Sequence, residues 1–170
     1  MKKGLTIFFC LLLFSACSSV KPLSTADVAA RYEAFVSASA TAETAEDFFQ
    51  MNVTKNGMSI ALFIEEPEEL RGLSITETDG EVTAEFEGMT VAFPAEKLPS
   101  AAPFLLFCEA LETLQAPNAF SVKSQKDGVS VTAKRFSAEL DPKTAALQTL
   151  EFPAEQVRFS LENVVFSEEK

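Results

Sequence analysis

The stretch FFQMNVTKNGMSIALFIEE, residues 48–66, carries the strongest folding signal of the chain. Asn56 and Gly57 stand between two apolar runs, and this dipeptide is the strongest short-range signature of a β-hairpin with a two-residue turn. A turn at these two residues pairs Val53 with Ile60. Because side chains alternate along a strand, the apolar residues of both runs share one face. The stretch therefore predicts two antiparallel strands with one buried face.

A second hairpin follows the same pattern. The segment LSITETDGEVTAEFEGMTVAF, residues 73–93, is predicted to turn at its Asp-Gly dipeptide (79–80) and to pair Ile75 with Ala84. Its apolar residues change parity around Gly88, which predicts a bulge or bend at that glycine.

A third hairpin is predicted in FSVKSQKDGVSVTAKRF, residues 120–136, with a turn at its own Asp-Gly dipeptide (127–128) and Val122 opposite Ala133. Three more strand-like stretches come after it, in RFSAEL, ALQTLEF and QVRFSLENVVF. All links between these strands are short, so the sequence predicts a meandering antiparallel sheet of about nine strands.

Two segments have helical periodicity instead. In STADVAARYEAFV, residues 24–36, Ser24 is the expected N-cap and Asp27 lies at the capping-box spacing. One helical face carries the larger side chains of this segment: Val28, Tyr32, Phe35 and Val36. The next residues, SASATAETAED (37–47), have few large apolar side chains and are predicted to be a surface connection.

The second helical segment is LPSAAPFLLFCEALETLQ, residues 98–115, in which Pro103 suits the first turn of a helix. The apolar side chains that repeat at helical spacing are Phe104, Phe107, Cys108, Leu111 and Leu114, with Leu105 widening the stripe. A long sheet curls, and its apolar face must be covered by other elements. The sequence therefore predicts an α+β domain over residues 24–170, in which about two amphipathic helices cover a curled antiparallel sheet.

The N-terminal stretch MKKGLTIFFCLLLFSACSSV has a basic head, a short apolar core and a small-residue end, which is the layout of a secretory signal peptide. Its ending, FSAC, resembles the lipobox of bacterial lipoproteins. That resemblance implies cleavage between Ala16 and Cys17 and lipidation of the Cys17 thiol, with residues 1–16 as signal peptide and 17–23 as a lipidated tether. The alternatives are a plain secretory signal and a membrane helix that contains cysteines. The lipobox implies an extracytoplasmic protein anchored to a membrane by its N-terminal lipid, and to the outer membrane if the host has two.

The amino-acid composition limits the binding and catalytic chemistry that is open to the chain. The chain has 170 residues and a net charge of −11, which argues against binding nucleic acid by charge. It has no histidine, so catalysis by a histidine-activated nucleophile is excluded and a zinc site is disfavoured. Cys108 is interpreted as a small buried apolar residue. We expect no enzymatic activity, no catalytic residue, no metal and no cofactor.

From about residue 45 to the end, the chain resembles the periplasmic lipoprotein-carrier family of LolA and LolB. APFLLFCEAL is similar to the lid helix of that family, FSVKSQKDGVSVTAKR to the hairpin after it, and FSAELDPKTAALQTLEF with VRFSLENVVF to the closing strands. The resemblance implies an open half-barrel with a helical lid. Two features depart from the family pattern. Glu66 precedes Pro67 where some carriers have an arginine, and FEGMTVAF lacks the tryptophan often found in that strand.

The resemblance leaves two functions open. The first is binding of a hydrophobic ligand (a lipid, an acyl chain or a lipoprotein) in a cavity between sheet and lid. The candidate cavity residues are Met51, Val53, Ile60, Leu62, Leu73 and Ile75 on the sheet, and Phe104, Leu105, Phe107 and Leu111 on the lid. The second is an anchored protein-interaction domain with a filled core and an acidic surface, whose partner is an envelope or wall-lytic protein, as in germination lipoproteins. A cavity of about 300 Å³ or more favours the first function.

Overall fold

The computed structural model describes residues 22–99, 102–125 and 128–167. Within these residues the chain forms two α-helices, α2 (Thr25–Glu33) and α3 (Pro103–Gln115), and two short 3-10 helices, η2 (Glu68–Leu70) and η3 (Ala95–Lys97). The strands are β1 (Phe35–Glu43), β2 (Phe48–Asn56), β3 (Ser59–Glu66), β4 (Ser74–Thr78), β5 (Glu81–Phe86), β6 (Met89–Pro94), β7 (Phe120–Ser124), β8 (Val129–Ala133), β9 (Ser137–Leu140), β10 (Leu147–Phe152) and β11 (Val157–Phe166).

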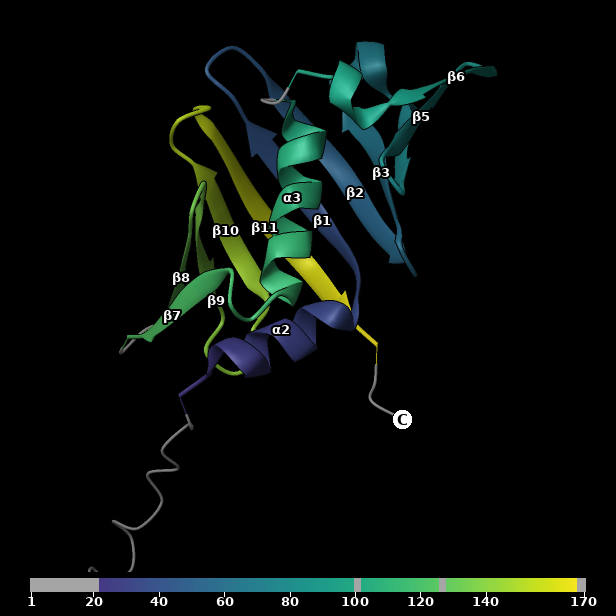
Figure 1. The fold of residues 1–170 in the computed structure, drawn as a ribbon. Helices are drawn as coiled ribbons and strands as arrows, with labels where there is room; N and C mark the ends of the chain where they lie inside the picture. The colour runs from purple at the N-terminus through teal and green to yellow at the C-terminus, as the bar shows by residue number, and fades with distance from the viewer. Residues whose placement is uncertain (1–21, 100–101, 126–127, 168–170) are drawn as a thin grey trace, which may run out of the picture.

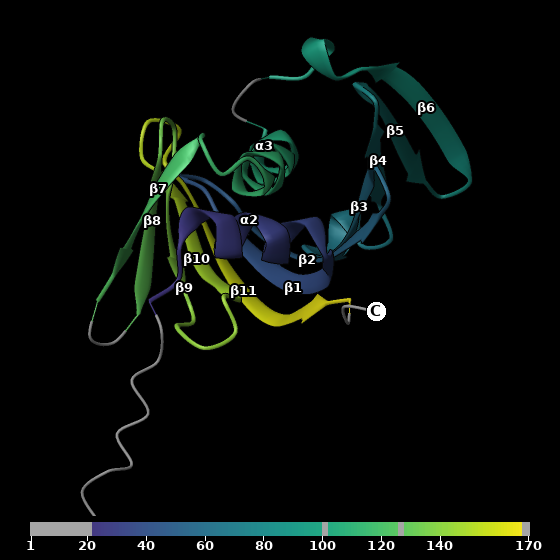
Figure 2. The same cartoon turned by 60° about the horizontal axis from the view of Figure 1, so that its bottom comes forward.

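All eleven strands belong to one antiparallel sheet with the order β6-β5-β4-β3-β2-β1-β11-β10-β9-β8-β7. The sheet curls around both helices but does not close into a barrel, because its end strands β6 and β7 do not pair with each other (Figures 1 and 2). The predicted α+β fold, a curled antiparallel sheet covered by helices, is confirmed.

Two meanders make up this sheet. Strands β1 to β6 pair in chain order, as do β7 to β11, and the two sets are joined where β1 pairs with β11. The predicted meander is therefore confirmed, but the number of strands was underestimated. Both β1 and β6 were missed as separate strands.

The interpretation of residues 37–47 as a surface connection was wrong. Most of that segment is β1, which lies between β2 and β11 near the middle of the sheet. Its inward side chains are small: Ala38, Ala40 and Ala42 are all buried. Small inward residues leave room for α3, which passes in front of β1 and β11 (Figure 1). Phe35 and Val36, predicted to lie on a helical face, are the first residues of this strand.

The first hairpin is present, but its turn lies one residue further along than predicted. Asn56 pairs with Ser59, and Val53 pairs with Leu62 rather than with Ile60. The reason is backbone conformation, since Gly57 has a φ of 62° and stands at the first central position of the turn. A positive φ at that position alone is the signature of a type II′ turn. The shift preserves the buried face.

Replacing Gly57 by valine is expected to lower the free energy of unfolding by about 1 kcal/mol or more, because a β-branched residue is strained at positive φ. A Cβ at this glycine would meet no atom within 4 Å, so backbone strain is the whole cost. The midpoint of urea denaturation measures it. Met58→Val is the matched control and should lose much less, because Met58, the other central residue of the turn, is 75% exposed and has no positive φ. An unchanged midpoint in the Gly57→Val variant would contradict the turn assignment.

The turn between β4 and β5 was predicted correctly. Asp79 and Gly80 both have positive φ, as a type I′ turn requires, and Ile75 pairs with Ala84. The prediction of a bulge or bend at Gly88 within one continuous strand was wrong. Glu87 and Gly88 also both have positive φ, so they form a second tight turn that starts β6 as a separate strand.

The third hairpin pairs Val122 with Val131 rather than with Ala133. The Gln125 N–H donates to the Gly128 carbonyl at 2.8 Å, so Gly128 lies opposite Gln125 and is not a central turn residue as predicted. The predicted turn residue Asp127 lies outside the described residues. The register differs by an even number of residues, so the predicted faces are again preserved.

Both helices begin where their sequence signals predicted. Ser24 is the N-cap of α2: its Oγ accepts a hydrogen bond from the Asp27 N–H at 3.2 Å, and the Asp27 carboxylate accepts one from the Ser24 N–H at 2.9 Å. Pro103 occupies the first turn of α3. The buried face of α3 is wider than predicted, because it also includes Leu106. Leu105 is only partly buried.

A filled core lies between the middle of α3 and the strands behind it. The ring of Phe107 on α3 packs edge-on against Phe159 of β11, with centroids 5.4 Å apart. Phe159 in turn contacts Phe152 of β10, and Phe152 contacts Phe136. This row of rings fills the space under the middle of the helix.

Polar contacts attach α3 to its surroundings. Arg135, which follows β8, forms ion pairs with Glu109 of α3 and with Glu155 in the turn between β10 and β11. The hydrogen bond from Arg135 lowers the pKa of the Glu155 carboxyl. At the other end of the helix, the Lys55 ammonium donates to the Gln115 side chain at 3.1 Å. These contacts hold the middle and the C-terminal end of α3, whereas its N-terminal end lies over the β2–β6 side of the sheet.

Candidate functional site

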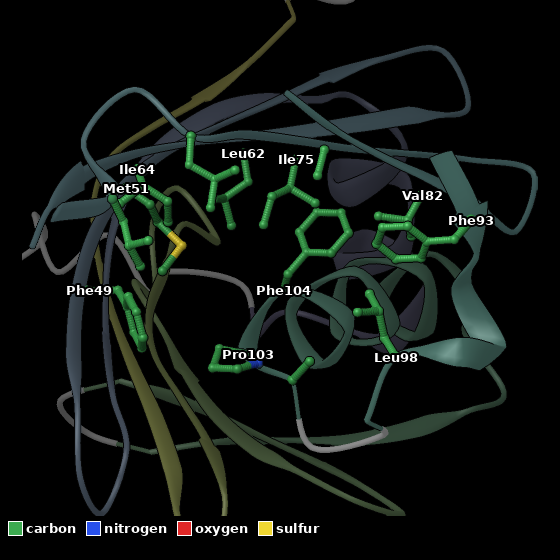
Figure 3. Close-up of a pocket in the computed structure, with 14 residues that line it drawn as sticks. Phe49, Met51, Leu62, Ile64, Ile75, Val82, Phe93, Leu98, Pro103 and Phe104 are labelled. Carbon is green, nitrogen blue, oxygen red and sulfur yellow. The ribbon is translucent and has the colours of Figure 1, made fainter. Parts of the chain in front are cut away.

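An apolar pocket of about 220 Å³ lies between the N-terminal end of α3 and strands β2 to β6 (Figure 3). Fourteen residues line it, and every one of their side chains is apolar: Phe49, Met51, Leu62, Ile64, Leu70, Leu73, Ile75, Val82, Ala84, Phe93, Leu98, Ala102, Pro103 and Phe104. The pocket therefore offers apolar contact on all lined sides and no hydrogen-bonding side chain.

Strand alternation positions most of these side chains. Val82 and Ala84 lie two apart on β5, and Val82 pairs with Phe93 of β6, so all three point to the concave face. Phe104 points into the same space from the first turn of α3 (Figure 3). Leu98, from the link after η3, closes the side opposite the strands. The pocket exists because β4, β5 and β6 continue the curl of the sheet beyond the reach of the helix (Figure 2).

The structure brings together half of the residues predicted to line a cavity. Met51, Leu62, Leu73, Ile75 and Phe104 line the pocket. The remaining predicted residues are not in its lining. Val53, Ile60, Phe107 and Leu111 are buried in the filled core, and Leu105 is partly buried on the side of α3. A ligand-binding role for any of these ten residues stays a prediction.

Sequence reasoning missed nine lining residues. Ile64, Val82 and Ala84 share the alternation that identified Leu62 and Ile75, so the pattern could have found them. Leu70 and Leu98 come from links between strands and carry no periodic signal. The position of the pocket also depends on where α3 starts, since Pro103 and Ala102 line it.

The volume limits what the pocket can hold. At about 220 Å³ it is smaller than the cavities of roughly 300 Å³ and more that enclose whole drug-sized ligands. It is larger than an apolar cavity of about 150 Å³, which is enough for benzene. The pocket therefore fits an aromatic ring or a short part of an alkyl chain.

The strands and links around the pocket are strongly acidic. Residues 65–97, here called the acidic wing, contain ten acidic and two basic residues. One of the acidic residues, Glu77, is only 9% exposed and pairs with the pocket residue Val82 across the strands. Its carboxylate accepts a hydrogen bond from the Gly80 N–H at 2.7 Å, which braces the turn. The pKa of the Glu112 carboxyl, on α3, is raised. The main cause is burial, followed by the negative charges of Glu77 and Glu109.

The reactive groups near the site are few. Burial, and after it the negative charges of Glu77 and Glu112, raise the pKa of the Cys108 thiol. This thiol is therefore protonated at neutral pH and is a poor nucleophile. Among the described residues, no group of three or more histidine, cysteine, aspartate or glutamate side chains is placed to hold a metal ion.

The predicted lipidation and cleavage residues, Ala16 and Cys17, lie outside the described residues. In the part of the chain that the structure covers, neither helix is both long and apolar enough to span a bilayer.

No protein-family model matches the sequence, and no curated protein matches it. Solved structures do resemble the fold. An uncharacterized conserved protein from Thermus thermophilus superposes with a TM-score of 0.54 at 8% sequence identity, over 86% of this chain and 87% of that chain. This likeness shows a shared fold. Two weaker likenesses are a LolA superfamily protein from Nitrosomonas europaea (TM-score 0.41, 8% identity, 87% of this chain and 96% of that chain) and the MucA/MucB complex of Pseudomonas aeruginosa (TM-score 0.43, 13% identity, 86% of this chain and 58% of that chain).

Proposed function

We propose that this protein is a lipid-anchored, extracytoplasmic binding protein, whose half-barrel takes the apolar part of a lipid or acyl chain into the pocket beside α3. The observation that carries the proposal is the lining of that pocket. Fourteen apolar side chains surround unfilled space beside the cluster of buried core residues. Such a pocket gains most from an occupant that is itself apolar.

The lining also bears on the kind of ligand. No lining side chain donates or accepts a hydrogen bond, so recognition rests on shape and apolar contact. The polar head of an amphiphile would stay outside the pocket, beside the acidic wing. Negative charge there disfavours an anionic head group, so an uncharged or zwitterionic ligand is favoured. We propose binding without catalysis.

The anchor rests on the N-terminal sequence. The lipobox-like FSAC implies acyl chains on Cys17. Each buried methylene adds about 0.8 kcal/mol of membrane affinity, and stable anchoring takes more than one chain. The open half-barrel and the resemblance to LolA and LolB support a carrier-like or receptor-like role at the membrane surface.

Filling the pocket should abolish binding while the fold is kept. We expect residues 22–170 to bind the uncharged fluorescent probe N-phenyl-1-naphthylamine saturably. Ala84→Phe places a ring in the pocket and is expected to weaken that binding by about tenfold or more, because it occupies the space for the ligand. The measurements are a probe titration and the thermal midpoint of each variant.

The matched control is Thr83→Phe. Thr83 is the neighbouring residue on β5 and points to the opposite face of the sheet. It should leave probe affinity unchanged. The proposal fails if the unmutated domain shows no saturable binding, or if Ala84→Phe, with a thermal midpoint like that of the unmutated domain, binds the probe equally well.

A further inference from the structure

One edge of the sheet is free for pairing. β6 has β5 on one side and no described strand on the other, and it lies at the end of the sheet away from both helices (Figure 2). In a hairpin with a two-residue turn, the two residues that flank the turn form both backbone hydrogen bonds with each other. The N–H and C=O groups of the next residue in each strand point away from the partner strand. That flanking pair is Phe86 with Met89. The backbone N–H and C=O groups of Thr90 and Ala92 therefore point away from β5 and out of the sheet.

The same strand exposes an apolar face. Met89 is 64% exposed and Val91 is 58% exposed, although both are large apolar residues. They alternate with Thr90 and Ala92, and so share the concave face with the pocket residue Phe93. The apolar surface of the pocket thus continues along β6 to the free edge. Neither helix covers it there (Figure 2).

The opposite, convex face of this edge is acidic. Glu85 pairs with Thr90 and Glu81 pairs with Pro94, so both carboxylates stand on the convex side next to β6. The convex side chains of β6 itself, Thr90 and Ala92, are small. A cationic side chain from a strand added at the edge would lie across these small residues and reach the carboxylates. The carboxylates belong to β5, two strand spacings or about 10 Å from the added strand, a gap that extended lysine and glutamate side chains span together.

We propose that β6 is a docking edge for an extended, basic, amphipathic segment of a partner protein. The segment adds a strand to the sheet through the backbone of Thr90 and Ala92. Its apolar side chains continue the surface of Met89 and Val91, and its lysine or arginine side chains pair with the acidic wing. A second copy of this chain fits poorly, because two acidic wings would then lie side by side. This inference is independent of ligand binding in the pocket.

The test uses the full chain in phosphatidylcholine nanodiscs and a fluorescent peptide of alternating lysine and valine, with empty nanodiscs as the blank. We expect saturable binding by fluorescence anisotropy, weakened as salt is added. Ala92→Pro removes one outward N–H, which an edge strand tolerates, and should weaken binding about tenfold. Ala92→Ser keeps both that N–H and a small convex side chain, and is the matched control, expected to bind as the unmutated chain does.

Two further peptides keep the test decisive if Ala92→Pro fails to fold. A peptide of alternating glutamate and valine should not bind. A lysine–valine peptide with alternate backbone nitrogens methylated should bind much more weakly to the unmutated chain, because it lacks the N–H groups for strand addition. The proposal is overturned if the lysine–valine peptide does not bind saturably or if either modified peptide binds equally well. It is also overturned if the chain forms a dimer that a folded Ala92→Pro variant dissociates, since the edge would then belong to a second copy.

Discussion

Replacing Phe107 by alanine is expected to lower the free energy of unfolding by about 3–5 kcal/mol. Phe107 is 1% exposed and lies at the centre of the filled core, against Phe159. Removing its ring leaves a void between α3 and β11 and breaks the row of aromatic contacts behind the helix. Because a domain is typically stable by only about 5–15 kcal/mol, this is a large share of the total. Urea denaturation followed by circular dichroism measures the change.

Phe107→Asp should be more severe and leave little folded protein, because a buried unpaired carboxylate adds its desolvation cost to the lost packing. The matched control for Phe107→Ala is Phe63→Ala, since Phe63 is 46% exposed on the convex face. It is expected to cost about 1 kcal/mol or less. If Phe107→Asp instead kept its thermal midpoint, α3 would be a detachable lid rather than a part of the core.

Replacing Cys17 by serine is expected to abolish lipidation completely and to prevent cleavage after Ala16. The reason is chemical, because the proposed anchor is built on the cysteine thiol, which serine lacks, so no acyl chain can be attached there. Incorporation of a clickable palmitate analogue during bacterial expression, together with the mass of the N-terminal peptide, measures both steps. The unmutated chain should incorporate the label and fractionate with membranes.

The control is Cys10→Ser, the same substitution seven positions earlier in the apolar core of the signal. It should leave labelling and cleavage intact, because only a cysteine that follows the small residues of the lipobox is expected to react. Recovery of the unmutated protein entirely in the soluble fraction, with an unmodified N-terminus, would end the lipoprotein hypothesis.

The features that sequence reasoning predicted best depend on local backbone chemistry. A capping box needs only Ser24 and Asp27 at the right spacing, and a type I′ turn needs only residues such as Asp79 and Gly80 that tolerate positive φ. The fold class also followed from short-range patterns, since short links between strands force antiparallel neighbours. The registers of two hairpins were less accurate, because a glycine marks a turn without fixing its own position in it. Gly57 is the first central residue of its turn, and Gly128 lies opposite Gln125.

The strand β1 escaped prediction because its inward residues are alanines. Alanine buries little apolar surface, so Ala38, Ala40 and Ala42 produce only a weak alternating signal. They are buried because α3 lies in front of this part of the sheet, which is a property of the tertiary structure (Figure 1). The same limit applies to the pocket. Alternation identified the apolar face of β2 to β4, but it did not show that Phe107 fills the core while Phe104, one turn earlier on α3, reaches the pocket.

The pairing of β1 with β11 affects the rate of folding. Each meander can form from strands that are neighbours in the chain, but Phe35 meets Phe166 only after nearly the whole described chain has closed into a loop. Closing such a loop costs entropy before its contacts are made, and contacts of high sequence separation slow folding. Until β11 arrives, β1 presents an unpaired edge that can capture other chains. The rate at which the last strand docks therefore governs how long the newly made protein is prone to aggregation.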